Sequence, residues 1–381
     1  MKIAIIGQGY VGRSIAQAAV GAGHSVVGFD SNSDVISALK ISGDFKGSTD
    51  AALIESAEVV VIAVPTPLDG ARTPDLSAVK AACKTIIENV KKPVLVINES
   101  TSYPGTLRNE IAAEIEGASG LGHLYAASPE RVDPGNEKWN QKNTPRLLAG
   151  LTPEATALAR KFYSSFCDQI VEVSNPEVAE AAKLFENTFR QVNIAVVNEF
   201  SQISDALDIP TREVVKAAAT KPFGFMSFQP GPGVGGHCIP VDPSYLAHVA
   251  EGAGVPATFI RYANEVNLGM PAYVVSRVVS DIGSLKGKKV VVVGVAYKAN
   301  VTDTREAPAA LVISELQKLG AEVSWHDPVV KTLNGQSSCD LKGFEAAIVV
   351  TKHDVVSESD IKACAPYVFD CTGSIQGVAG L

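Results

Sequence analysis

Long apolar runs, aromatic side chains and blocks of positive charge are scarce in this chain of 381 residues. No segment approaches the roughly 18 consecutive apolar residues of a membrane-spanning helix, and the first apolar run breaks at Gly7, too early for a signal peptide. With 33 Lys and Arg against 41 Asp and Glu, the net charge is −8, which argues against a nucleic-acid or membrane-surface partner. The 13 Phe, 9 Tyr and 2 Trp are few, so Val, Ala, Ile and Leu must build the core.

The cysteines form no recognisable set of metal ligands. None of the six stands in a Cys-x-x-Cys pair or at the spacing of a metal site. They are Cys83, Cys167, Cys238, Cys339, Cys364 and Cys371. This usage predicts a reduced, cytoplasmic protein with mostly buried thiols and no bound metal.

What the chain does contain is enough apolar sequence for a large core, since 46 % of its residues are hydrophobic and only 19 % are charged. Such a composition excludes a disordered protein, and the length predicts two or three domains. In the first 130 residues, short β-branched runs alternate with helix-forming stretches, which indicates βαβ units and a doubly wound sheet. Buried parallel strands are predicted at residues 3–6, 25–29, 59–64, 94–97 and 124–127.

A helical region follows at residue 176, where Asn175 can cap a helix and Pro176 fits its first turn. Apolar residues at three- and four-residue spacing continue this helix to residue 206. After a loop rich in Pro and Gly at 221–243, a second helix is predicted at 257–282. The β pattern then returns. Strands are predicted at 290–293, 322–325 and 346–350, with a helix at 308–319.

This order of elements predicts an α/β fold with two Rossmann-like doubly wound domains, joined by a long central helix and a small all-α domain. We expect residues 1–175 to bind a dinucleotide, residues 176–285 to form the helical domain, and residues 286–381 to form the second Rossmann-like domain. A weak internal repeat in the sequence supports the prediction of two similar domains. Residues 2–30 and 289–327 share the order strand, glycine, helix, strand, aspartate.

The segment Gly7–Gly12 reads Gly-Gln-Gly-Tyr-Val-Gly, directly after a predicted strand and at the start of a predicted helix. Gly7 permits a tight turn, Gly9 lets the backbone approach a pyrophosphate, and Gly12 allows the helix to pack closely on the strand. The helix N-terminus offers N–H groups to the phosphates. Asp30 ends the next strand, where its carboxylate can accept hydrogen bonds from both adenosine ribose hydroxyls and would repel a 2′-phosphate. The segment therefore predicts NAD in preference to NADP.

A second glycine segment, at 293–298, lacks the full fingerprint but is accompanied by cations. Lys298 and Arg305 lie within one predicted loop-to-helix segment. Side-chain charge at this place suits a second diphosphate. The alternative is a solvated surface Lys and Arg that bind no ligand.

The segment 231–243 reads Gly-Pro-Gly-Val-Gly-Gly-His-Cys-Ile-Pro-Val-Asp-Pro and is the most unusual of the chain. Cys238 follows a Gly-Gly pair that would permit close approach of a ligand, and it stands beside His237 and four residues before Asp242. A thiolate is a strong nucleophile whose pKa falls near cations. From the residues alone, Cys238 can be interpreted either as a nucleophile or as an inert thiol.

These segments together resemble the UDP-glucose/GDP-mannose dehydrogenase family, the nucleotide-sugar 6-dehydrogenases, over nearly the whole chain. Further motifs carry the resemblance. They are Val-Pro-Thr-Pro at 64–67 with Asp-Leu-Ser at 75–77, Glu-Ser-Thr-Ser-Tyr-Pro-Gly-Thr at 99–106, Ser-Pro-Glu-Arg at 128–131, Ala-Lys-Leu-Phe-Glu-Asn at 182–187, Tyr-Lys at 297–298 and Asp-Thr-Arg-Glu at 303–306. The motif Ser-Pro-Glu-Arg-Val-Asp-Pro-Gly at 128–135 and Gly-Gly-His-Cys at 235–238 resemble the branch that oxidises UDP-N-acetylhexosamines, more than the UDP-glucose branch.

The resemblance implies a four-electron oxidation of the C6 primary alcohol of a UDP-sugar to the uronic acid with two NAD, for surface polysaccharide. Cys238 would attack the intermediate aldehyde to give a thiohemiacetal. A second hydride transfer would give a thioester, which water would cleave. The tether explains the need for a thiol, because a free aldehyde hydrates or escapes.

The resemblance also assigns roles to residues. Lys183 matches a lysine that stabilises developing negative charge and Asn187 its oxyanion partner, and their spacing puts both on one helix face. The other catalytic residues are Glu130 for thioester hydrolysis, Thr101 for ordering water and Asp242 for acid–base chemistry. The cofactor-binding set is Gly7, Gly9, Tyr10, Val11, Gly12, Asp30, Pro65, Thr66, Thr101 and Arg305. The substrate-binding set is Glu130, Arg131, Lys183, Asn187, Gly235 and Lys298.

One departure from the family's pattern is Asp-Cys-Thr-Gly at 370–373, where many relatives carry Asp-Thr-Arg-Asn, so a substrate-binding arginine is absent. Two alternatives stay open. A one-step β-hydroxyacid dehydrogenase would need neither Cys238 nor the C-terminal domain, and a catalytically silent nucleotide-sugar-binding protein would need no catalytic set. The resemblance also implies a homodimer or higher homo-oligomer formed through residues 176–285, because this helical region must bury an apolar face.

Overall fold

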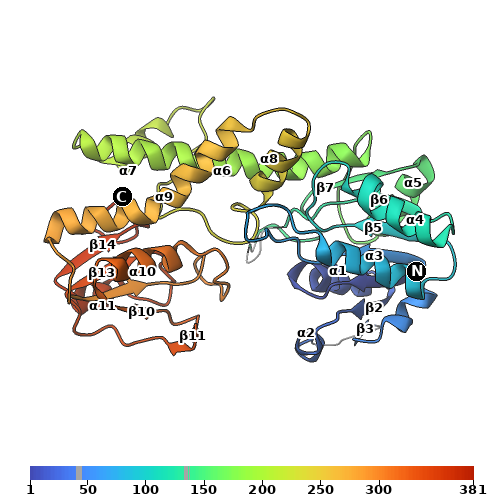
Figure 1. Cartoon of the computed structure of the whole chain (residues 1–381), viewed down its shortest axis with the longest axis horizontal. Coiled ribbons are helices and arrows are strands. Elements are labelled where there is room, and N and C mark those ends of the chain that lie inside the picture. The colour runs from blue at the N-terminus through green and yellow to red at the C-terminus, as the bar shows by residue number, and fades with distance from the viewer. Residues whose placement is uncertain (40–44, 133–135, 137) are drawn as a thin grey trace. The chain divides into compact units, whose positions relative to one another are not determined.

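The computed structural model describes residues 1–39, 45–132, 136 and 138–381 (Figure 1). Contacts between segments divide the chain into two compact units. The first consists of residues 1–186 and 244–255, and the second of residues 187–243 and 256–381. Each unit contains its own parallel sheet and its own apolar core.

A mostly parallel sheet forms the centre of the first unit (Figure 1). Over the described residues it has eight strands, in the order β3-β2-β1-β4-β5-β6-β7-β8. They are β1 (Lys2–Ile6), β2 (Ser25–Phe29), β3 (Phe45–Ser48), β4 (Val59–Ile62), β5 (Leu95–Asn98), β6 (Leu124–Ala127), β7 (Arg146–Gly150) and β8 (Ile170–Glu172). Strands β1 to β6 run parallel, and β7 pairs antiparallel with β6. The strand order reverses between β1 and β4, which is the place where doubly wound folds bind nucleotides.

Aliphatic residues buried on both faces explain why these strands form. On one face, Ile5 and Val61 pack with apolar residues of α1 (Tyr10–Gly21) and α5 (Pro153–Tyr163). Residues on the opposite face, such as Ile62, are also buried, as is typical of parallel sheets. The other helices of this part of the chain are α2 (Ser33–Ser37), η1 (Ala51–Ser56), α3 (Ser77–Asn89), η2 (Thr106–Ala112) and α4 (Ala113–Ser119).

Helix α6 (Pro176–Ala206) begins where the sequence predicts, because the side-chain oxygen of Asn175 accepts a hydrogen bond from the N–H of Val178 at 3.0 Å. Its first turns, up to residue 186, belong to the first unit and the remainder to the second. Helix α8 (Asp242–Gly252) is also shared between the units. The second unit further contains α7 (Thr211–Ala218) and α9 (Thr258–Ile282).

A parallel sheet with the strand order β10-β9-β13-β14-β15 forms the centre of the second unit. Buried residues of α9 and of the next helix, such as Val274 and Val312, pack against Val292 and Ile348 of this sheet. The elements are β9 (Lys289–Val293), α10 (Pro308–Lys318), β10 (Glu322–His326), β11 (Thr332–Leu333), β12 (Gln336–Ser337), β13 (Ala346–Val349), α11 (Glu358–Cys364), β14 (Tyr367–Asp370) and β15 (Ala379–Gly380). Strands β11 and β12 form a separate antiparallel pair.

The predicted α/β fold class with two Rossmann-type sheets is confirmed. The predicted loop at 221–243 is wrong at its C-terminal end, because Asp242 begins α8 and Pro243 occupies a first-turn position that tolerates proline. Strands β3, β7 and β8 and helix α5 also form where the sequence predicted no element.

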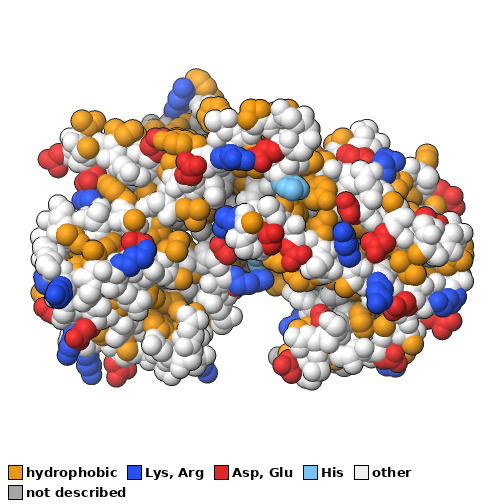
Figure 2. Space-filling model, in the orientation of Figure 1, with side chains coloured by type: hydrophobic (Ala, Val, Ile, Leu, Met, Phe, Trp, Pro, Cys, Tyr) orange, Lys and Arg blue, Asp and Glu red, His pale blue; other side chains and the backbone are white. Residues whose placement is uncertain are grey.

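The face drawn in Figure 2 carries positive and negative side chains interspersed, without a basic block in view. A polyanion would find no continuous stripe of cations on this face. Within the described ranges, no helix combines the length and the apolar character needed to cross a bilayer.

Candidate active site

Five loops that carry predicted site residues leave the carboxyl ends of parallel strands in the first unit. They follow β1, β2, β4, β5 and β6 and contain, in that order, Gly7–Gly12, Asp30, Thr66, Thr101 and Glu130. Because parallel strands end at the same edge of a sheet, the fold brings these residues to one edge.

The glycine segment after β1 has the geometry that its three glycines predict. Gly7 has a φ of +94°, and a Cβ there would lie 2.4 Å from a carbonyl oxygen of the segment after β4. A Cβ at Gly12 would lie 1.9 Å from the carbonyl oxygen of Gly7, so packing requires both glycines. At Gly9, in contrast, no described atom lies within 4 Å of the place of a Cβ. This open place adjoins the first turn of α1, at Tyr10 and Val11, and fits a pyrophosphate bound by backbone N–H groups.

Asp30 is held beside the glycine segment by the backbone. Its Oδ2 accepts a hydrogen bond from the N–H of Gln8 at 2.8 Å, and its Oδ1 accepts one from the N–H of Asn32 at 2.9 Å. A carboxylate oxygen has a second lone pair, so each can also accept a hydroxyl hydrogen. The residues of this edge therefore fit the adenosine ribose and pyrophosphate of NAD.

Ser100 ties the loops after β4 and β5 together. Its hydroxyl accepts a hydrogen bond from the N–H of Val64 at 2.9 Å and donates one to the carbonyl oxygen of Val64 at 2.8 Å. The turn that leads to Pro65 and Thr66 is thereby fixed against the segment of Thr101. Pro65 is exposed and the two threonines are partly exposed, so all three can contact a ligand.

Glu130, after β6, is buried among polar partners. Its Oε1 accepts hydrogen bonds from the N–H groups of Arg131 and Val132 at 2.6 Å each, and its Oε2 accepts from Gln141 at 2.5 Å and from Arg146 at 3.2 Å. Burial alone would raise the pKa of Glu130, but the charge of Arg146 and these hydrogen bonds outweigh burial and hold the pKa below its ordinary value. The carboxylate is therefore ionised at neutral pH and fixed in orientation, as a general base requires.

The guanidinium of Arg131 has partners within the first unit. It donates to the carbonyl oxygen of Pro145 at 2.7 Å and to the carboxylate of Glu186, on α6, at 2.7 Å. Its predicted contact with the substrate stays a prediction. Residues 133–135, which complete the motif at 128–135, lie outside the described residues.

Helix α6 carries Lys183 and Asn187 one turn apart. The side-chain amide of Asn187 donates to Oδ2 of Asp242 at 2.5 Å, so two of the predicted catalytic residues meet in the second unit. Asp242 is only 1 % exposed and opens α8.

Glu180, one turn before Lys183, is a buried carboxylate that the sequence analysis missed. Its Oε2 accepts a hydrogen bond from the N–H of Gly105 at 2.7 Å and its Oε1 accepts one from the N–H of Leu107 at 2.9 Å, at the start of η2. Burial raises the pKa of Glu180 to about 7. These bonds tie the segment that contains Thr101 to α6 within the first unit.

Cys238 lies in a loop that packs on the segment 297–306 of the second unit. Its sulfur lies 3.1 Å from Nδ1 of His237, and the N–H of Gly236 donates to the carbonyl oxygen of Arg305 at 3.0 Å. The N–H of Asp242 donates to the carbonyl oxygen of Cys238 at 2.8 Å and leads the chain into α8. The thiol is therefore held in a turn that is fixed on both sides.

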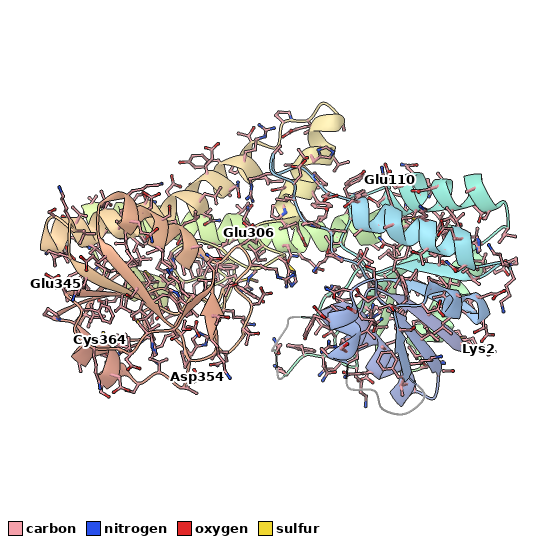
Figure 3. All side chains as sticks on the ribbon, turned by 60° about the horizontal axis from the view of Figure 1, so that its bottom comes forward. Lys2, Glu110, Glu306, Glu345, Asp354 and Cys364 are labelled. Carbon is pink, nitrogen blue, oxygen red and sulfur yellow. The ribbon has the colours of Figure 1, made fainter. Side chains whose placement is uncertain are left out.

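The Gly-Gly pair before His237 serves the packing of this loop. A Cβ at Gly235 would lie 2.9 Å from Cβ of Tyr297 and 3.0 Å from the carbonyl oxygen of Glu306, a residue labelled in Figure 3. At Gly236, where φ is +83°, a Cβ would lie 2.9 Å from the ring of Tyr297. The sequence interpretation attributed the freedom of these glycines to the approach of a ligand, whereas Tyr297 occupies the space beside them. The contact of Gly235 with substrate stays a prediction.

The two predicted phosphate-binding cations, Lys298 and Arg305, belong to the same segment. The guanidinium of Arg305 pairs with the carboxylate of Asp303 at 2.5 Å, and this hydrogen-bonded partner raises the pKa of Arg305. The side chain of Arg305 remains 61 % exposed, so the ion pair leaves it open to a further anion.

The predicted catalytic and binding residues fall into two groups, one in each unit. The first unit holds Gly7–Gly12, Asp30, Pro65, Thr66, Thr101, Glu130, Arg131 and Lys183. The second unit holds Asn187, Gly235, Cys238, Asp242, Lys298 and Arg305. The dinucleotide set is therefore confined to the first unit, except for Arg305, and the thiol belongs to the second.

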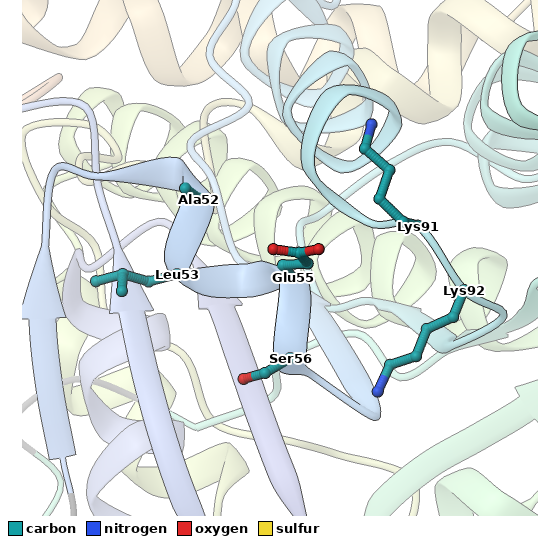
Figure 4. Close-up of a pocket in the computed structure, with 6 residues that line it drawn as sticks. All are labelled: Ala52, Leu53, Glu55, Ser56, Lys91 and Lys92. Atoms are coloured by element: carbon teal, nitrogen blue, oxygen red, sulfur yellow. The ribbon is translucent and has the colours of Figure 1, made fainter.

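A hollow in the surface of the first unit lies away from these loops (Figure 4). It is lined by Ala52, Leu53, Glu55, Ser56, Lys91 and Lys92. These residues precede β4 and β5, so they lie at the amino ends of the strands, at the edge opposite Thr66 and Thr101. The hollow is therefore no part of the candidate site.

A sheet of this strand order, with a glycine segment after its first strand and an aspartate after its second, is typical of a dinucleotide-binding protein. Family models give the more particular assignment. The UDP-glucose/GDP-mannose dehydrogenase family matches with its NAD binding domain at residues 33–167, its central domain at 177–268 and its UDP binding domain at 291–376. The chain belongs to the UDP-glucose/GDP-mannose dehydrogenase family.

Individual relatives agree with this assignment. The UDP-N-acetyl-D-glucosamine 6-dehydrogenase of Pseudomonas aeruginosa is 36 % identical over 354 residues, which cover 87 % of this chain and 83 % of that protein. The UDP-N-acetyl-D-mannosamine dehydrogenase of Methanococcus maripaludis is 33 % identical over 395 residues, which cover 96 % of this chain and 90 % of that protein. The solved UDP-D-ManNAc dehydrogenase of Pyrococcus horikoshii has a TM-score of 0.90 and 30 % identity, and covers 100 % of this chain and 99 % of that one. The predicted enzyme class, an NAD-dependent nucleotide-sugar dehydrogenase, is confirmed.

Proposed function

We propose that this dehydrogenase oxidises the C6 primary alcohol of a UDP-N-acetylhexosamine to the carboxylate in two successive oxidations, through a covalent intermediate on Cys238. The observation that carries the proposal is the thiol of Cys238, held 3.1 Å from Nδ1 of His237 in a chain that matches both an NAD binding and a UDP binding domain. A single oxidation of an alcohol to an aldehyde needs no such thiol.

NAD, when bound, accepts the hydride from C6 in each of the two oxidations. The sulfur of Cys238 attacks the C6 aldehyde, and the new C–S bond gives a thiohemiacetal whose carbon still carries a hydrogen to lose. Its oxidation gives a thioester. Water then adds to the thioester carbon, the C–S bond breaks and the thiolate leaves. One alcohol and one water thus give one carboxylate, two hydrides and three protons.

Four further residues supply the remaining chemistry in this proposal. Lys183 offers a positive charge and Asn187 an N–H donor to the oxyanions that develop at C6. Glu130 takes a proton from the attacking water, which Thr101 helps to orient. Asp242 accepts the amide hydrogen of Asn187 at 2.5 Å, which supports a role in orienting that donor beside its predicted acid–base role.

The substrate class rests on two supports. The Gly-Gly-His-Cys motif at 235–238 resembles the branch of the family that acts on UDP-N-acetylhexosamines. The similar proteins from Pseudomonas aeruginosa and Methanococcus maripaludis are named for UDP-N-acetyl-D-glucosamine and UDP-N-acetyl-D-mannosamine. We therefore prefer an N-acetylated sugar to glucose.

The diphosphate end of the substrate is assigned to Lys298 in this proposal. Thr372 stands where many relatives carry an arginine, and an arginine of α7 lies beside the next residue. Arg212 donates to the carbonyl oxygens of Cys371 at 2.8 Å and Leu381 at 3.1 Å, and a Cβ at Gly373 would lie 2.4 Å from its Nε. The C-terminal segment is thus held by an arginine instead of supplying one.

A homodimer or larger homo-oligomer formed through residues 176–285 also belongs to the proposal. Phe189, Val196 and Ile203 recur every seven residues on α6 and are 44 %, 59 % and 50 % exposed, and Phe259 on α9 is 81 % exposed. Apolar residues at this spacing form one stripe, and exposed apolar stripes mark interfaces. Light scattering is expected to give at least twice the chain mass of 39.9 kDa, and a monomer at micromolar concentration would contradict this part of the proposal.

Two further predictions stay proposals. The division into residues 1–175, 176–285 and 286–381 is supported by the family matches at 33–167, 177–268 and 291–376. Both proposed domain boundaries fall between matched segments. A cytoplasmic location is supported by the spacing of the six cysteines in the sequence, which includes no Cys-x-x-Cys pair and no metal-ligand spacing.

The test of the proposed function combines a panel of UDP-sugars with trapping of the thioester. NADH should form fastest with a UDP-N-acetylhexosamine. The variant Glu130→Gln, mixed with that sugar and NAD, should accumulate a mass increase on the peptide that contains Cys238. The double variant Glu130→Gln/Cys238→Ala is the matched control and should show no increase. A best activity on UDP-glucose would overturn the substrate class, and the absence of any adduct in Glu130→Gln would overturn the role of Glu130.

A further inference from the structure

A buried network of polar side chains contacts the carboxylate of Glu130. Oε2 of Glu130 accepts from Nη2 of Arg146 at 3.2 Å and from Nε2 of Gln141 at 2.5 Å, and the same Nη2 donates to Oε1 of Gln141 at 2.5 Å. The other arm of Arg146 pairs with Glu99 at 2.8 Å. The hydroxyl of Tyr163 donates to the remaining oxygen of Glu99, and the Tyr163 ring lies 4.4 Å from the guanidinium carbon of Arg146.

This arrangement is costly for a protein that would use it only for stability. Glu99 is 1 % exposed, Arg146 5 % and Glu130 8 %, so two carboxylates share one guanidinium away from water. Buried ion pairs are often replaceable by apolar residues of similar volume without loss of stability, because removing charges from water is expensive. The network lies directly under the proposed base of thioester hydrolysis, which suggests that it serves the chemistry.

The two carboxylates differ in what surrounds them. Glu130 has Arg146, Gln141 and the N–H groups of Arg131 and Val132 as donors. Within the described part of the chain, the contacts of the Glu99 carboxylate are an ion pair with Arg146 and a hydrogen bond from a tyrosine hydroxyl. Burial raises the pKa of Glu99 to about 7, against the lowering effect of Arg146, while the pKa of Glu130 lies below its ordinary value. When Glu99 holds a proton, the charge of Arg146 therefore acts mainly on Glu130.

We propose that Arg146 is the positioning residue of Glu130 and that a protonated Glu99 leaves the charge of Arg146 to this carboxylate, so that Arg146 sets both the orientation and the basicity of the carboxylate that activates water. The inference rests on the proposed function, because Glu130 must be the base. In the step concerned, the water oxygen bonds to the thioester carbon, a water proton passes to Glu130, and the C–S bond breaks to release the thiolate of Cys238.

The other titratable groups around Glu130 among the described residues are few. The thiol of Cys167 lies in the same buried cluster as Arg146, and burial raises its pKa. Burial also raises the pKa of Tyr163. On the outer side, the guanidinium of Arg131 is paired with Glu186 of α6. None of these supplies Glu130 with the charge that Arg146 supplies.

The experiment measures the pH dependence of thioester hydrolysis in single turnovers, after both hydride transfers are complete. A base works only when it is deprotonated, so the rate falls on the acid side of its pKa. The pKa of Glu99 is about 7 and that of Glu130 lies below its ordinary value, so Glu99 is already neutral at the acid limb of the profile, where the rate falls because Glu130 is protonated. Glu99→Gln keeps the volume and this neutral state, so it should leave the acid limb within about 0.3 pH units of the wild type. Arg146→Met should move the limb to higher pH by about one unit or more and let thioester accumulate at neutral pH.

The matched control is Arg160→Met, an arginine of α5 that pairs with Glu172 at 2.6 Å on the surface and should leave the profile unchanged. Thermal unfolding shows whether each variant folds. If Arg146→Met does not fold, Arg146→Lys decides, because it keeps a charge but lacks the forked guanidinium, and it should lower the plateau rate of hydrolysis several-fold. An acid limb and a plateau rate that both stay unchanged in the folded Arg146 variant would overturn the inference, even if Glu130→Gln traps the thioester, and a shift of a full pH unit in Glu99→Gln would contradict the neutral state assigned to Glu99. A Glu130→Gln variant that traps none would instead overturn the role of Glu130 in the proposed function.

Discussion

Asp30 shows how one carboxylate can select a cofactor. Its two oxygens already accept backbone N–H groups on either side of the glycine segment, so the carboxylate is oriented before any ligand arrives. A preoriented acceptor loses little freedom when a ribose hydroxyl binds, and its charge opposes a phosphate at the same place.

We predict that Asp30→Ala raises the KM for NAD by roughly 10- to 100-fold, as expected for the loss of hydrogen bonds to a charged group, and narrows the preference for NAD over NADP. Steady-state rates with both cofactors measure the effect. Asp34→Ala, at an exposed aspartate of α2, is the control and should change neither value. A wild-type enzyme that used NADP as well as NAD would contradict the assigned role.

Gly235 illustrates a residue that packing requires. The Cβ of an alanine there would lie about 3 Å from Cβ of Tyr297 and from the carbonyl oxygen of Glu306, so we predict that Gly235→Ala lowers the free energy of unfolding by about 1–3 kcal/mol. Gly231→Ala in the same loop is the control and should cost about 0.5 kcal/mol or less, since its nearest neighbour lies 3.9 Å from the place of a Cβ. Urea unfolding compares the two. Equal losses would show that contact with Tyr297 is not the reason for this glycine.

At this scale the sequence predicts residues whose role depends on a local motif. Gly7 has the tight-turn geometry that its motif predicts, whereas the roles of Asp30 and Cys238 stay predictions. The sequence analysis missed Arg146 and Tyr163, because their role depends on a carboxylate, Glu99, that lies far away in the chain and is brought close by the fold. An arginine at the start of a strand looks like a surface residue until that strand pairs with its neighbours.

At the scale of elements, the contact between α6 and the start of η2 joins two parts of the candidate site. Glu180 supplies the acceptors that the N–H groups of Gly105 and Leu107 would otherwise lack. It thereby holds the segment of Thr101 against the helix that carries Lys183. A buried carboxylate that caps a helix from another element cannot be recognised from spacing, because its partners are distant in sequence.

We predict that Glu180→Ala lowers the free energy of unfolding by about 2–4 kcal/mol, because two buried N–H groups lose their acceptors. Glu177→Ala, one turn earlier, removes only a pair with the half-exposed Arg108 and should cost about 1 kcal/mol or less. Since burial raises the pKa of Glu180 to about 7, its contribution is fully present below the unfolded pKa and is lost as pH rises through 7. The difference between wild type and Glu180→Ala in urea unfolding should therefore be larger at pH 5 than at pH 8. A difference that grows with pH would contradict this account.

How well the sequence predicts a strand depends on the position of that strand in the sheet. The strands between β1 and β6 that lie inside the sheet are apolar on both faces, and the sequence predicts them with small errors at their ends. Strand β3 and the outer strand β8 are partly exposed, so their residues lack the continuous apolar run that indicates a buried strand. Strand β7 is buried, but it begins with the charged Arg146, so its sequence lacks the apolar start from which a buried strand is predicted.

At the scale of the whole molecule, the chain combines an NAD binding domain, a helical region with the thiol, and a UDP binding domain. The sequence predicts this order because each Rossmann-like region repeats strand, glycine and helix. The packing of the Gly235–Cys238 loop on Tyr297 and Arg305 was not predicted, since it joins segments that no motif connects. The thiol is thereby tied to the same segment as the cation proposed to hold the diphosphate, Lys298.

The most direct test of the central claim is the number of NADH formed per UDP-sugar consumed. If Cys238 is the covalent nucleophile, the wild-type enzyme yields two NADH and a carboxylate, with no free aldehyde. Cys238→Ala should lose several orders of magnitude in rate and, in single turnovers, stop at the aldehyde with at most one NADH per sugar. Cys339→Ala, at a partly buried thiol, is the control and should still give two. One NADH from the wild type would indicate a one-step dehydrogenase and none a silent binding protein, whereas two NADH from Cys238→Ala at near wild-type rate would contradict the mechanism.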